Sequence, residues 1–131
     1  MNLIKHIFLS VAALLAAADI SFSQTYSITP NDTFRTSGMM EDQQTLTISQ
    51  LNVSVNNITL GWKKISENVP LNWEASVCDN KICYPILVDS GRMNPVPPTE
   101  MGFLLLHITA HVNYGTSIIR YAVWDINVPD L

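Results

Sequence analysis

The feature of this chain that most constrains its fold is an alternation of apolar and polar residues, which runs from Thr45 to the C-terminus. Apolar residues recur at every second position in short runs that turn residues interrupt, for example in 58–62, 102–109 and 116–125. This period of two is typical of β-strands with one buried face. No amphipathic helix is predicted in residues 24–131, so the alternation predicts an all-β domain.

The spacing of the runs narrows the architecture. About seven short strands at roughly ten-residue spacing predict a two-sheet β-sandwich of the immunoglobulin or fibronectin type III kind. A small closed barrel is the competing architecture. One irregularity lies at Gln50, where the alternation of Leu46 and Ile48 changes phase before Leu51, and such a change predicts a β-bulge or a strand that moves between sheets.

The three tryptophans, Trp62, Trp73 and Trp124, each lie in phase with apolar neighbours in a predicted strand. Large aromatic side chains in such positions are more often core residues than binding platforms. We therefore expect at least two of the three to be buried.

The N-terminus has the pattern of a secretory signal peptide. A basic residue, Lys5, precedes an apolar run of about a dozen residues, and the small residues Ser21 and Ser23 follow it. The run is too short for a membrane span, which needs about 20 apolar residues. Residues 1–23 are therefore predicted to be a cleaved signal peptide and 24–131 a single exported domain without a stable membrane span, in which the polar segment 24–44 is loosely ordered.

The charge of the chain excludes one class of partner. The formal net charge is −4, and the sequence shows no basic stripe of the kind that binds a phosphate backbone. Nucleic acid is therefore not an expected partner.

Cys78 and Cys83, the two cysteines of the chain, lie in the predicted exported domain, where disulfides persist. Facing residues of an antiparallel hairpin have Cα atoms about 4.5–5.5 Å apart, which a disulfide can span. A thiol-redox pair usually has two intervening residues, whereas residues 79–82 intervene here. A structural disulfide across a tight hairpin is predicted.

His107 and His111 have the spacing that would place two imidazoles over one zinc ion on a helix. On the strand predicted for 102–109, a rise of about 3.3 Å per residue would separate them by roughly 13 Å. They could not share a metal ion unless the strand ended between them. The alternative hypothesis is a periplasmic metal-handling or thiol-redox protein that uses these histidines with Cys78 and Cys83.

Catalytic chemistry has no recognisable signature in the sequence. Ser90-Gly91 lacks the flanking pattern of a nucleophile elbow, and no carboxylate is marked by its neighbours as an acid or a base. The chain is predicted not to be an enzyme, and no catalytic residue or cofactor is expected.

Residues 70–126 carry a resemblance. The pattern Trp-x-x-x-x-Cys-Asp-x-x-x-Cys-Tyr from Trp73 to Tyr84 precedes Ser90-Gly91, a proline-bearing turn and two long strands. It resembles small secreted immunoglobulin-like β-sandwich modules of Bacteroidetes-type bacteria, whose function is largely unassigned. The resemblance implies an extracellular or periplasmic domain. In such modules a C-terminal sorting domain often follows, and none follows here, which favours a periplasmic or freely secreted location.

These observations lead to one hypothesis. We expect a secreted or periplasmic, non-enzymatic interaction or structural module that binds a protein or a surface glycan. No binding residue is identified from the sequence.

Overall fold

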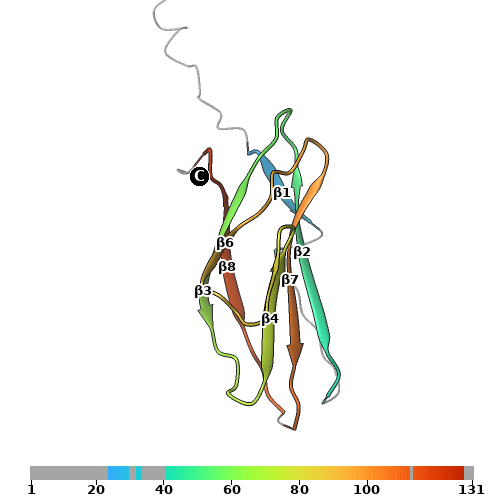
Figure 1. The fold of residues 1–131 in the computed structure, drawn as a ribbon, viewed down its shortest axis with the longest axis vertical. Coiled ribbons are helices and arrows are strands. Elements are labelled where there is room, and N and C mark those ends of the chain that lie inside the picture. The colour runs from blue at the N-terminus through green and yellow to red at the C-terminus, as the bar shows by residue number, and fades with distance from the viewer. Residues whose placement is uncertain (1–23, 30–31, 34–40, 113, 129–131) are drawn as a thin grey trace, which may run out of the picture.

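The computed structural model describes residues 24–29, 32–33, 41–112 and 114–128 as two antiparallel sheets that pack face to face (Figure 1). The predicted all-β sandwich is confirmed. The described residues form eight strands and no helix, where about seven strands were expected. The strands are β1 Tyr26–Thr29, β2 Gln44–Asn52, β3 Leu60–Glu67, β4 Glu74–Asp79, β5 Cys83–Tyr84, β6 Ser90–Arg92, β7 Met101–Thr109 and β8 Ile119–Asp125.

The larger sheet has the order β1-β2-β7-β4-β5. Its centre is β7, which pairs with β2 on one side and with β4 on the other. Leu104 and Leu106 of β7 point into the sandwich together with Val77 of β4, which is fully buried. The other face of the same strands points outward, because side chains alternate between the two faces of a sheet.

The smaller sheet has the order β6-β3-β8. Its central strand, β3, buries Leu60 and Trp62 completely, and its register with β8 shifts between Lys64 and Ser66. The phenol of Tyr26 in the other sheet donates a hydrogen bond of 2.7 Å to the Val123 carbonyl, and burial, helped by the charge of Asp125, raises the pKa of this phenol. The sheets are therefore joined by a polar contact as well as by the core.

Trp62 is the centre of the core. Its indole Nε1 donates a hydrogen bond of 2.8 Å to the buried carboxylate of Asp79, and its ring contacts Tyr84 and Tyr121 edge to face. The other Asp79 oxygen accepts hydrogen bonds from the backbone N–H groups of Lys81 and Ile82. One buried carboxylate thus couples the smaller sheet to the β4–β5 hairpin of the larger one.

The phase change at Gln50 is not a bulge, and that prediction is wrong. The register of β2 with β7 runs unbroken from Gln44 to Leu51, and the alternation places two polar residues, Gln50 and Asn52, inside the sandwich. The Asn52 amide donates to the carbonyls of Asn56 and Val96 at 2.8 Å. Backbone carbonyls therefore satisfy the buried Asn52 amide, at a position where the alternation predicted an apolar residue.

The expectation that two tryptophans are buried is also wrong. Trp62 is fully buried, whereas Trp73 and Trp124 are partly exposed. Trp73 precedes β4. Trp124 lies on the outward face of β8, because the adjacent residue Val123 pairs with Trp62 and points into the core. Being in phase with apolar neighbours did not reveal which face of the strand would be covered.

The predicted signal peptide, residues 1–23, lies outside the described residues. Within the segment 24–44, β1 forms the edge of the larger sheet and β2 begins at Gln44. No helix in the described part of the chain is long and apolar enough to cross a membrane.

Candidate functional site

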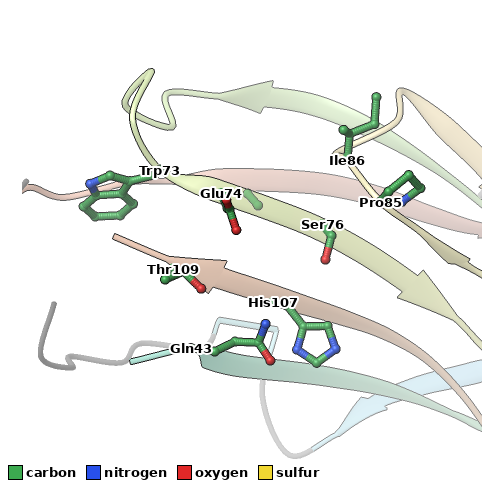
Figure 2. Close-up of a pocket in the computed structure, with 9 residues that line it drawn as sticks. Gln43, Trp73, Glu74, Ser76, Pro85, Ile86, His107 and Thr109 are labelled. Carbon is green, nitrogen blue, oxygen red and sulfur yellow. The ribbon is translucent and has the colours of Figure 1, made fainter. Parts of the chain in front are cut away.

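A shallow groove of about 320 Å³ lies on the outward face of the larger sheet. Figure 2 shows Trp73 at one end of it and Pro85 and Ile86 toward the other, with polar side chains of β4 and β7 between them. The lining residues are Gln43, Trp73, Glu74, Ala75, Ser76, Pro85, Ile86, His107 and Thr109. Four separate segments of the chain therefore contribute to one surface.

The register explains why polar side chains line the groove. Ser76 pairs with His107, and Glu74 pairs with Thr109, so these four side chains point outward in two adjacent rows. Their alternate neighbours, such as Val77, point into the core. On the other side of β7, Thr45 pairs with His107, and the Thr45 hydroxyl lies 3.2 Å from His107 Nδ1. The groove thus presents hydroxyl, imidazole and carboxylate groups on neighbouring strands, which lie about 4.8 Å apart in a sheet.

A charged cluster borders the groove. His111 lies just beyond the end of β7, and its Nδ1 is 3.0 Å from Glu41 while its Nε2 is 3.3 Å from Glu74. Both Glu41 and His111 have left-handed backbone conformations, with φ of 69° and 48°. The hydrogen bond that the Glu41 carboxylate accepts from His111, reinforced by the charges of Glu41 and Glu74, raises the pKa of His111. His111 therefore links Glu41 to Glu74 at the edge of the groove.

The two histidines do not form the site that a metal hypothesis requires. The strand ends at Thr109, between His107 and His111, which was the condition for a shared ion. His107 nevertheless contacts Thr45, and His111 contacts two glutamates. Within the described ranges, no group of three or more His, Cys, Asp or Glu side chains lies in an arrangement that could hold a metal ion.

The cysteines are joined to each other, as expected. Cys78 of β4 and Cys83 of β5 form a disulfide and are directly paired across the hairpin. In this form neither sulfur is available as a thiolate ligand or as a redox nucleophile. The disulfide, together with the hydrogen bonds to Asp79, fixes the hairpin that leads to Pro85 and Ile86 of the groove.

Sequence reasoning identified His107 alone among the lining side chains as a candidate for chemistry. Trp73, Glu74 and Ser76 belong to a predicted strand, but their role depends on which strands lie beside it. The sequence did show that the polar residues Glu74 and Ser76 share one face of the predicted strand, which indicates a solvent-facing surface. This pattern became informative only once β7 was placed next to β4.

Comparison with known proteins supports the fold. The solved structure of the N-terminal domain of PorA is similar to this chain, with a TM-score of 0.53 and 13% sequence identity. The alignment covers 65% of this chain and 63% of that one, so this chain matches less than two thirds of the PorA domain's length. No family model matches the sequence, and no curated protein matches it. At this level of identity the likeness concerns the fold alone.

Proposed function

We propose that this protein is an exported, non-enzymatic interaction module whose groove on the larger sheet binds an uncharged surface glycan. The observation that carries the proposal is the groove itself, where an indole and five hydrogen-bonding side chains surround one open surface (Figure 2). A sugar ring needs both features, because its C–H face packs on an aromatic ring while its hydroxyls exchange hydrogen bonds with polar side chains.

Charge favours an uncharged ligand over an anionic one. Glu74 is a lining residue whose side chain is 80% exposed, and Glu41 lies close to it through the shared contact with His111. The carboxylates of Glu41 and Glu74 would repel a polyanion bound in the groove, since like charges a few ångströms apart repel even in water. Export is supported by the disulfide, by the resemblance to secreted sandwich modules and by the signal-peptide pattern predicted for residues 1–23.

The proposal is tested by titrating the secreted protein with neutral oligosaccharides of different linkage and following backbone amide shifts by NMR. Shifts should concentrate at Ser76, His107 and Thr109, and Trp73→Ala or His107→Ala should weaken binding by roughly tenfold, the loss of one well-placed contact. Thr47→Ala is the matched control, because Thr47 lies on the same face of β2 but outside the groove. Shifts confined to other surfaces, or equal effects of the control, would assign the groove no binding role.

A further inference from the structure

The outward face of the smaller sheet gathers positive charge in a chain whose net charge is −4. The described residues include five lysines and arginines, and three of them, Lys63, Arg92 and Arg120, lie on this face. They come from β3, β6 and β8 respectively, and all three are exposed. The sequence separates them by up to 57 positions, so this concentration arises only from strand pairing.

The register places the three cations along one diagonal across β6, β3 and β8. Trp62 points into the core, and therefore its neighbours Gly61 and Lys63 point outward. Gly61 pairs with Arg92 on one side and with Trp124 on the other. Lys63, two residues along β3, is thus diagonal to Arg92.

Arg120 completes the set from the other side of β3. Lys63 pairs with Ala122 of β8, and Arg120 lies two residues from Ala122 on the same face of that strand. Lys63 is therefore a diagonal neighbour of Arg92. Arg120 lies at the next outward position of β8, opposite Ser66 and beyond the register shift between Lys64 and Ser66.

Trp124 lies at the Arg92 end of this group, because Gly61 leaves room for it. A Cβ atom at Gly61 would lie 2.9 Å from Cε2 and Cζ2 of the Trp124 indole, closer than real Cβ contacts allow. The indole therefore lies across the glycine, on the outward side of the sheet. It forms a partly exposed aromatic surface beside the cations.

Carboxylates do not neutralise these cations. Asp125, the acidic residue of β8, is buried. Glu67 and Asp89 both pair with Lys64, which belongs to the opposite face of β3. Within the part of the chain that the structure describes, none of the three outward cations forms an ion pair.

We propose that this cationic face, formed by Lys63, Arg92, Arg120 and Trp124, binds an acidic polysaccharide that carries carboxylates. Charge complementarity selects the ligand, because three unpaired cations that extend along the sheet from one aromatic surface match a chain in which sugar rings and carboxylates alternate. The sugar ring packs on Trp124 while its carboxylates contact the guanidinium and ammonium groups. This site is distinct from the groove on the larger sheet, and its test is independent of the groove.

The first experiment measures binding of the secreted protein to immobilised polygalacturonate by biolayer interferometry, with neutral dextran in parallel. Polygalacturonate should bind with an affinity that falls as salt is raised, and dextran should not bind at this face. The triple variant K63A/R92A/R120A should weaken binding by roughly tenfold or more. Lys81→Ala removes one charge from the exposed β4–β5 hairpin and should change the affinity by less than about twofold.

The second experiment separates the aromatic surface from charge alone. Gly61→Ala should displace the indole and weaken polygalacturonate binding, and Trp124→Ala should weaken it at least as much, while far-ultraviolet circular dichroism shows both variants folded. If either variant unfolds, Trp124→Leu is used instead, because it removes the aromatic ring but keeps an apolar side chain over Gly61. It should likewise weaken polygalacturonate binding.

Three outcomes would overturn the inference. One is the absence of polygalacturonate binding, and another is an equal effect of Lys81→Ala and of a single substitution on the face, which would indicate non-specific attraction. The last is equal or tighter binding of phosphatidylglycerol vesicles or single-stranded DNA with the same dependence on the variants. That result would assign the face to a different class of ligand.

Discussion

The interior of the sandwich and its two outer faces use the same residue type in opposite ways. Trp62 is fully buried, with its N–H bonded to a buried carboxylate, whereas Trp73 borders the groove and Trp124 lies across Gly61 on the cationic face. All three alternate with apolar neighbours in the sequence. The difference teaches that alternation predicts a strand, while the packing of a second layer decides whether a large side chain stabilises the fold or remains available to a ligand.

The largest effect should come from the interior. Trp62→Ala should reduce the free energy of unfolding by about 3–5 kcal/mol, the cost of truncating a buried aromatic side chain, and it also leaves one Asp79 oxygen without its donor. Trp62→Phe, which retains a ring but loses the N–H, should cost roughly 2 kcal/mol. Urea denaturation measures both. A loss below about 1 kcal/mol for Trp62→Ala would remove the distinction between interior and surface.

Two glycines provide a matched pair for the same comparison. A Cβ at Gly91 would overlap the buried Trp62 indole, which cannot move, so Gly91→Ala should destabilise the domain by about 2–3 kcal/mol. A Cβ at Gly61 meets Trp124 instead, whose indole can shift into solvent, so Gly61→Ala should cost about 1 kcal/mol or less. Thermal and urea unfolding of the two variants tests the order. Equal losses would mean that Trp124 is held as firmly as Trp62.

The β4–β5 hairpin should contribute less than the core behind it. Replacing both Cys78 and Cys83 by Ser should lower the free energy of unfolding by about 2 kcal/mol, because a disulfide that closes so short a loop restricts the unfolded chain only modestly. The hydrogen bonds of Asp79 to Lys81 and Ile82 hold the hairpin independently. Urea denaturation measures the loss, and mass spectrometry with and without reductant verifies the bond in the native protein. Failure of the double variant to fold would contradict this ranking.

Truncation on the cationic face should cost less again. Trp124→Ala should destabilise the domain by about 1 kcal/mol, since the indole is partly exposed and its removal leaves no closed cavity. Urea denaturation beside Trp62→Ala makes the comparison direct. A loss approaching that of Trp62→Ala would place Trp124 among the core residues and weaken its assignment to a ligand surface.

The smallest effect concerns His111 at the border of the groove. Because hydrogen bonding to Glu41, together with the charges of Glu41 and Glu74, raises the pKa of His111, its contribution to stability is fully present below the pKa of the unfolded chain, about 6.5. That contribution is lost as the pH rises through the folded pKa. NMR titration of the ring should show the raised pKa, and Glu41→Gln should lower it. An unchanged pKa in that variant would remove Glu41 as its cause.

Several parts of the fold followed from local sequence. The alternation predicted strands and an all-β sandwich, and the spacing of Cys78 and Cys83 on a tight hairpin predicted their disulfide, because facing positions in a hairpin are fixed by a few residues. Other parts did not follow. Gln50 and Asn52 broke the apolar pattern. The Gln50 amide donates to the Ile48 carbonyl of its own strand, whereas the Asn52 amide donates to the carbonyls of Asn56 and Val96, which lie outside β2.

The candidate sites show the same division more sharply. The sequence by itself determined that Arg120 and Trp124, and likewise Ser76 and His107, lie in strands, whereas the predicted run 58–62 ended before Lys63. The tertiary structure alone decided that β6, β3 and β8 share a sheet and that β4 and β7 are neighbours, which gathered these residues into a cationic face and a groove. The physical reason is that side-chain alternation is a property of one strand, whereas strand order depends on hydrogen bonds and core contacts between segments far apart in the chain.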